Sequence, residues 1–187
     1  MDAFLLAMIL TFVIAFGSRE QRIVAQFSDA MGRNVPLLLI AAVCAVVSAA
    51  IMAYFGAGLA EIMPRRAAEM LVAFALGIAA FELFWPVKMK PMKEPTRSYV
   101  AIAAVLLFRQ VGDGARFVIF AIAVWSVYPT TALIGGAIAG LVAVALGWSA
   151  GLKRLEQFPL RAARLVLGFF LLSAALVIGL NARFEFL

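Results

Sequence analysis

Long runs of apolar residues, separated by proline and charge, are the feature that most constrains how this chain can fold. A helix needs about 20 apolar residues to cross a bilayer. Hydrophobic side chains make up 66% of the 187 residues and charged ones 14%, whereas an ordinary soluble domain has about 25% charged residues. The length leaves room for about six spans. We therefore expect an all-α integral membrane protein with six transmembrane helices.

The six predicted helices fall into two groups of three. They cover residues 2–32, 36–63, 65–85, 98–126, 130–156 and 160–181. A polar stretch at 86–97, rich in lysine and proline, predicts a linker between a first three-helix repeat (1–85) and a second (98–187). One constant offset pairs Gly17 with Gly112, Glu61 with Glu156, Pro64 with Pro159 and Arg66 with Arg161. Because each repeat has an odd number of spans, the two repeats would be inverted relative to each other.

Basic residues outside the spans predict the orientation in the membrane. Alternating sides along the six helices places a larger group on one side: Arg33, Lys88, Lys90, Lys93, Arg97, Lys153, Arg154, Arg161 and Arg164. The smaller group on the other side is Arg65, Arg66 and Arg183. The positive-inside rule then puts the 86–97 linker in the cytoplasm and both termini outside, and we expect a bacterial inner membrane.

The residue types that are scarce narrow the possible functions. The chain has no histidine and one cysteine, Cys44, which disfavours histidine-based catalysis, haem and zinc sites. Without histidine the chain lacks the usual pairing of a nucleophile with a base, so we expect neither an enzyme nor a bound cofactor. The net charge of +6 comes from cations at the ends of apolar runs, a pattern that does not predict a nucleic-acid partner.

Ionisable residues inside the predicted spans are concentrated in the first and fourth segments. They are Arg19, Glu20 and Arg22 in the first and Arg109, Asp113 and Arg116 in the fourth. Charge at that depth is costly and usually functional, although a buried ion pair can also serve only structure. Helical spacing predicts the pairs Arg19 with Asp113, and Arg109 or Arg116 with Glu20. For Glu69 and Glu82 in the third segment, a role in the functional site and a purely structural role are equally expected.

The motifs at these positions resemble those of a known family. The stretches Ala15-Phe16-Gly17-Ser18-Arg19-Glu20-Gln21 and Gln110-Val111-Gly112-Asp113-Gly114 are similar to the repeated signature Glu-x-Gly-Asp-(Lys/Arg)-(Ser/Thr). That signature belongs to the Gdt-one / TMEM one-six-five family of divalent-cation/proton antiporters, in the LysE-like exporter superfamily. The resemblance implies exchange of manganese or calcium for protons. It departs from the family where Ala15, Ser18 and Gln110 replace carboxylates, so one of the four motif carboxylates, Asp113, remains.

The resemblance and the residues together predict a substrate and proton-coupling site. Asp113 is the expected titrating group and metal ligand, with Glu20 as a substitute for the lost acids. The remaining members are neutral oxygen donors, charge partners and helix-contact glycines: Ser18, Gln21, Gln110; Arg19, Arg109, Arg116; Gly17, Gly112. The two glycines would let the backbone bend or let the helices approach closely where they meet. The alternatives are a transporter of an anionic or zwitterionic substrate and a non-transporting paralogue with a scaffolding role. Association into a homo-oligomer stays open.

Overall fold

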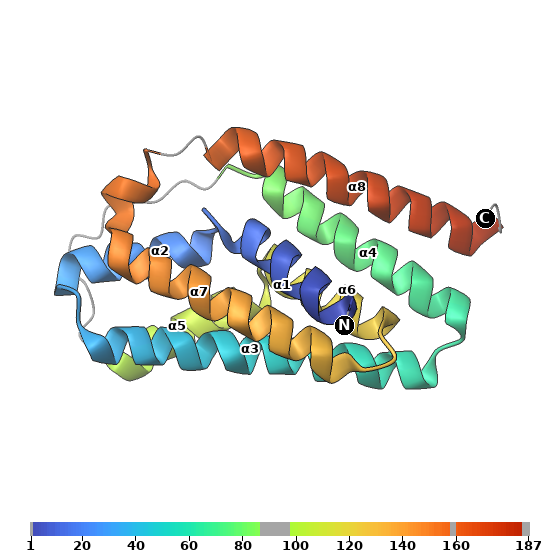
Figure 1. Ribbon diagram of the computed structural model, residues 1–187, viewed down its shortest axis with the longest axis horizontal. Helices are drawn as coiled ribbons and strands as arrows, with labels where there is room; N and C mark the ends of the chain where they lie inside the picture. The colour runs from blue at the N-terminus through green and yellow to red at the C-terminus, as the bar shows by residue number, and fades with distance from the viewer. Residues whose placement is uncertain (1, 87–97, 158–159, 185–187) are drawn as a thin grey trace.

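The computed structural model describes residues 2–86, 98–157 and 160–184 (Figure 1). This part of the chain is helical and contains no strand. Its helices are α1 (Asp2–Ala15), α2 (Arg19–Met31), α3 (Val35–Ile62), α4 (Arg65–Phe84), α5 (Tyr99–Val111), α6 (Gly114–Trp125), α7 (Pro129–Leu155) and α8 (Leu160–Phe184). The predicted linker at 86–97 lies outside the described residues except for Pro86, so the division into two repeats stays a prediction.

Four of these helices, α3, α4, α7 and α8, are long and apolar enough to cross a membrane. A fifth span is added if α1 and α2, which meet at a bend of 58°, are counted as one broken span. Helices α5 and α6 are apolar but shorter. The all-helical class and the apolar helices compatible with a membrane protein are therefore confirmed.

The prediction of continuous helices over 2–32 and 98–126 was wrong, because each segment forms two helices with a break between them. At the first break Gly17 adopts φ +74°, a left-handed conformation that side chains with a Cβ disfavour. At the second, Gly112 ends α5 and Asp113 precedes α6 in an extended conformation. Polar and charged residues follow Gly17 and flank Gly112, at the points where the helices break.

Helix α6 lies at the centre of the bundle (Figure 1). Almost every residue from Gly114 to Val124 is buried, and α6 packs against α1, α3, α4 and α7. The close approach of α3 to α6 requires glycine at position 56, because a Cβ there would lie 2.8 Å from the carbonyl oxygen of Phe120. Helices α4 and α8 lie side by side along one flank. The fold thus surrounds the break before α6 with other helices.

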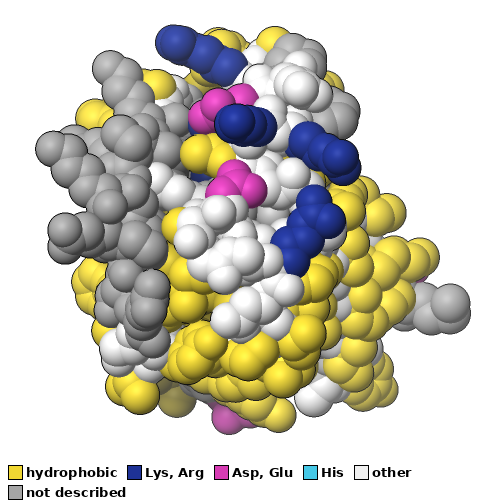
Figure 2. All heavy atoms as spheres, turned by 90° about the vertical axis from the view of Figure 1, so that its left-hand side faces the viewer, with side chains coloured by type: hydrophobic (Ala, Val, Ile, Leu, Met, Phe, Trp, Pro, Cys, Tyr) yellow, Lys and Arg dark blue, Asp and Glu magenta, His cyan; other side chains and the backbone are white. Residues whose placement is uncertain are grey.

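The outer surface separates apolar from basic side chains. Large apolar residues such as Phe74, Phe81 and Phe169 are exposed on the sides of the bundle, as expected for a surface that faces lipid. Figure 2 shows Lys and Arg side chains gathered on the end where α2 and α7 finish and α3 and α8 begin. The exposed basic residues there are Arg33, Lys153, Arg154 and Arg161. The opposite end carries Arg65, Arg66 and Arg183.

Candidate functional site at the two helix breaks

A closed hydrogen-bond network joins four helices beside the breaks. Glu20 Oε1 of α2 accepts from Gln110 Nε2 of α5 at 2.5 Å and from Arg116 Nη2 of α6 at 3.3 Å. Ser48 Oγ of α3 accepts from Arg116 Nε at 3.0 Å, and the Ser48 hydroxyl lies 3.1 Å from Gln110 Oε1. All four side chains are buried. The network therefore links residues up to 96 positions apart in the chain.

The ion pair in this network is almost fully removed from solvent. The side chains of Arg116 and Glu20 are 1% and 4% exposed. The guanidinium lies against Gly140 of α7, where a Cβ would be 3.4 Å from Arg116 Nη2. Within the described part of the chain, Glu20 Oε2 and Arg116 Nη1 have no hydrogen-bond partner. Buried polar atoms are normally satisfied, so these two retain capacity for a ligand or water.

The first break is held by its own side chains. Ser18 caps α2, its Oγ accepting from Gln21 N at 3.3 Å. Gln21 Oε1 accepts from Gly17 N at 2.7 Å, and Gln21 Nε2 donates to the carbonyl oxygen of Ala143 at 2.9 Å. This arrangement resembles a capping box, in which the side chains of N-cap and N3 residues satisfy free backbone groups. Ser18 and Gln21 are thus occupied in fixing the bend.

A small cavity of about 170 Å³ opens between the two breaks. It is lined by Arg19, Glu20, Glu82, Phe108, Arg109, Gly112 and Asp113. The carboxyls of Glu20, Glu82 and Asp113 therefore share one cavity. Like charges so close repel each other, which favours a proton or a cation between them.

Two acidic residues beside the second break, Asp113 and Glu82, line this cavity. Gly114 N, at the start of α6, donates to Glu82 Oε2 of α4, so a side chain from another helix caps α6. Asp113 makes no side-chain cap of its own, and its Oδ2 is buried without a donor among the described residues. The positive end of the α6 dipole favours negative charge on both groups.

The structure forms one of the two predicted ion pairs. Arg116, rather than Arg109, pairs with Glu20, while Arg109 is exposed at the cavity wall. Arg19 and Asp113 line the same cavity, but the described residues form no ion pair between them. Gly112 makes no close helix contact, since no described atom lies within 4 Å of the position that a Cβ would take there. The role of each residue in transport stays a prediction.

Sequence reasoning left Glu82 open and missed two residues beside the cavity, Ser48 and Arg164. Glu82 was evenly balanced between site and structure, and its contact with Gly114 comes from the packing of α4 on α6. Ser48 gave no signal, because a lone serine in an apolar helix is common. Arg164 was assigned to the cytoplasmic side, yet it is 5% exposed and donates from Nη2 to the carbonyl oxygen of Glu82 at 3.3 Å.

The acidic cavity has few ligands for a metal ion. Among the residues that the structure describes, no group of three His, Cys, Asp or Glu side chains is arranged to hold one. Manganese and calcium prefer several hard oxygen ligands, and Arg19 and Arg109 in the wall oppose a dication.

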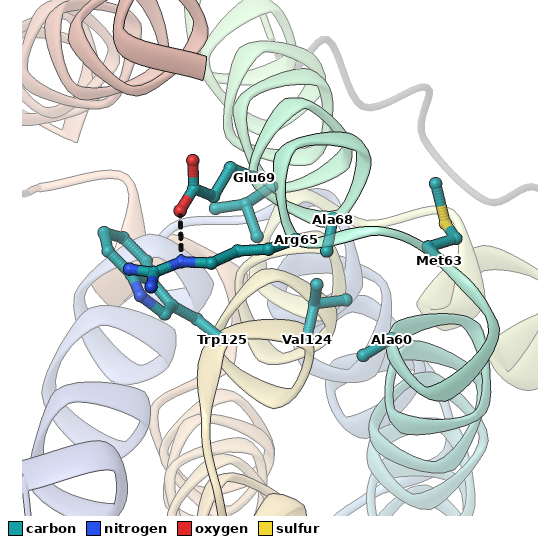
Figure 3. Close-up of a pocket in the computed structure, with 8 residues that line it drawn as sticks. Ala60, Met63, Arg65, Ala68, Glu69, Val124 and Trp125 are labelled. Carbon is teal, nitrogen blue, oxygen red and sulfur yellow. Dashed lines mark hydrogen bonds and ion pairs between the residues drawn. The ribbon is translucent and has the colours of Figure 1, made fainter. Parts of the chain in front are cut away.

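A larger cavity of about 450 Å³ lies at the other end of the bundle, between the end of α3, the start of α4 and the end of α6 (Figure 3). The charged side chains in its wall, Arg65 and Glu69, bond each other at 3.0 Å. Arg65 is 91% exposed. This cavity lacks the buried, incompletely bonded carboxyls of the smaller one, which is the stronger candidate site.

Comparison of the chain with protein-family models, with curated proteins and with solved structures gives no match.

Proposed function

We propose that this protein is a proton-coupled secondary transporter whose proton-exchange centre is Asp113 together with Glu20 and Glu82. One observation carries the proposal: three carboxyls from different helices meet in a cavity at two helix breaks, inside a bundle of apolar helices. Ionisable groups inside a membrane are expensive and usually mark an ion or proton pathway. Discontinuous helices are where many secondary transporters bind substrate.

The packing of the helices supports the predicted inverted repeat. Helices α1 and α2 break at Gly17 as α5 and α6 break at Gly112, which are equivalent positions in the sequence repeat. Helix α1 packs on α7 as α5 packs on α3, and α2 packs on α7 as α6 packs on α3. In this scheme the acidic cavity lies between the two repeats, where transporters of this plan place their substrate.

The first candidate substrate is a divalent cation, manganese or calcium, exchanged for protons as the family resemblance implies. Asp113 and Glu82 would alternate between holding a proton and facing the cation, because both line one cavity and either a proton or a cation relieves the repulsion between neighbouring carboxylates. Glu20 would contribute less, since its Oε1 is bonded by Gln110 and Arg116. The cation would displace the shared proton.

The second candidate substrate is an anion or a zwitterion. It is favoured by the guanidinium groups of Arg19 and Arg109 in the wall of the same cavity. Arginine binds carboxylate and phosphate groups with paired hydrogen bonds. In this scheme the ligand's negative group competes with Asp113 for arginine, and protonation of Asp113 couples to binding.

The charge distribution supports an orientation with the α2–α3 and α7–α8 turns in the cytoplasm. These turns lie at the end with Arg33, Lys153, Arg154 and Arg161, which the positive-inside rule places on the cytoplasmic side of an inner membrane. Helix α1 begins and α8 ends in the other half of the bundle (Figure 1). The start of α1 and the end of α8 would therefore face the outside.

Flux measurements in proteoliposomes test the function. Manganese uptake and internal pH are followed together under an imposed pH gradient, for the wild type, Asp113→Asn and Glu82→Gln. Glu69→Gln, on the same helix as Glu82 but in an exposed ion pair, is the matched control. We expect gradient-dependent flux that Asp113→Asn and Glu82→Gln abolish and Glu69→Gln retains.

The alternatives give different results in the same assay. In one alternative, protons move when an anion or amino acid is added but not when manganese is added. This result would identify the substrate as an anion or zwitterion and exclude the divalent cation. A folded wild-type protein that moves neither protons nor substrate would refute transport and leave a scaffolding role.

A further inference from the structure

A second polar cavity, of about 250 Å³, lies between α2, the end of α4 and the start of α8. Three arginines line it: Arg22 from α2, and Arg161 and Arg164 from the first turns of α8. Among the described residues, no acidic side chain is in its wall. Its lining is thus strongly basic, and the N-terminal end of α8 adds the positive end of a helix dipole.

Arg164 is the group that points to a ligand. Its side chain is 5% exposed, one nitrogen (Nη2) donates to the carbonyl oxygen of Glu82, and the other (Nη1) is buried with no hydrogen-bond partner in the described structure. A buried guanidinium with an unused donor is costly. An acceptor placed in the cavity would satisfy it.

We propose that this cavity binds a phosphate group, held by Arg161, Arg164 and Arg22. A tetrahedral phosphate offers several acceptor oxygens to arginines that approach from different sides. A carboxylate has two acceptor oxygens in one plane and a single charge, so it matches three guanidinium groups from two helices less well than a phosphate does. The site does not depend on the proposed transport, because none of its arginines lines the acidic cavity.

The rest of the wall indicates where the phosphate comes from. Leu83, Phe84, Trp85 and Leu165 complete the cavity with apolar surface, and Trp85 is 71% exposed at the end of α4, a position typical of a tryptophan at the membrane interface. Basic pockets between membrane helices on the cytoplasmic side bind anionic lipid headgroups. A lipid headgroup and free phosphate would both present a phosphate group to the arginines, and the experiment below distinguishes the two.

Ligand-dependent thermal unfolding of the full chain in neutral detergent tests the site, since a ligand that binds only the folded protein raises its unfolding temperature. The probes are dioctanoyl-phosphatidylglycerol, dioctanoylglycerol as the matched lipid without phosphate, and inorganic phosphate at constant ionic strength. Arg161→Gln removes an exposed member of the site without disturbing the core. Arg154→Gln removes an exposed arginine at the same end that does not line the cavity.

We expect a concentration-dependent rise in unfolding temperature with phosphatidylglycerol and none with dioctanoylglycerol. Arg161→Gln should weaken the apparent affinity by about fivefold to tenfold, as expected for one arginine at a membrane surface, and Arg154→Gln should leave it unchanged. A rise with inorganic phosphate as well would identify free phosphate as sufficient. No rise with either phosphate probe, or equal weakening by both substitutions, would overturn the proposal.

Discussion

The buried ion pair between Arg116 and Glu20 gives the sharpest prediction about stability. Replacing Arg116 by Met keeps the volume of the stem but leaves Glu20 without its cation and Ser48 Oγ without the donor at 3.0 Å. The two side chains are 1% and 4% exposed, so water cannot replace the lost bonds. Removing one partner of a buried pair costs about 3–5 kcal/mol. We expect a loss of this size in the free energy of unfolding.

A double-mutant cycle isolates the pair itself. Glu20→Gln keeps an oxygen for Gln110 and removes the charge, and the double variant removes both charges. Because Arg116 and Glu20 are in direct contact, the double variant should be more stable than the sum of the single losses predicts, by about 2 kcal/mol. Unfolding in mixed micelles of neutral and denaturing detergent, followed by tryptophan fluorescence, measures all four proteins.

The exposed pair Arg65–Glu69 is the control for this cycle. Its members are four residues apart on α4, and the arginine is 91% exposed. Such pairs contribute about 0.3–0.5 kcal/mol, so the cycle Arg65→Met with Glu69→Gln should show little coupling. Additive losses at Arg116 and Glu20, within about 0.5 kcal/mol, would refute the inference that the two side chains bond each other in the folded protein.

The glycines give two further predictions, each with an internal control. Gly17→Ala should lower the free energy of unfolding by about 1–2 kcal/mol, because φ is +74° there. Gly112→Ala should be tolerated, since its φ is −90° and no described atom lies within 4 Å of the new Cβ; equal losses would show that the first break is not strained. Gly147→Ala should cost about 1–3 kcal/mol by overpacking, because its Cβ would lie 2.7 Å from the carbonyl oxygen of Gln21. Gly77→Ala, with open space around it, should cause no loss, and the same unfolding assay compares the two.

Several helix boundaries could be predicted from local signals. The segments 36–63, 65–85 and 130–156 correspond to α3 (Val35–Ile62), α4 (Arg65–Phe84) and α7 (Pro129–Leu155). Proline is compatible with the first turn of a helix and not with its interior, so it fixes where these helices start. Asn34 adds a cap, its Oδ1 accepting from Leu37 N at 3.2 Å.

The helix breaks could be predicted only in part. The sequence predicts that Gly17 and Gly112 let the backbone bend or let helices approach closely, but a glycine inside a membrane helix is common, so the residue alone does not decide between the two. What makes each a break is the set of partners that take over the free backbone groups. Gln21 does so at the first break and Glu82, 32 residues away in the chain, at the second.

The sequence by itself determined the chemical content of the centre: apolar helices, two segments that carry most of the charge within them, and a pairing of Glu20 with either Arg109 or Arg116. The structure selected Arg116. Only the tertiary structure decided which other groups join them. Glu82 reaches Asp113 because α4 packs on α6, and Arg164 is buried because α8 packs on α4. Residue spacing fixes which side chains share a face of one helix. The depth and rotation at which two helices meet depend on the packing of the whole bundle, which no local pattern specifies.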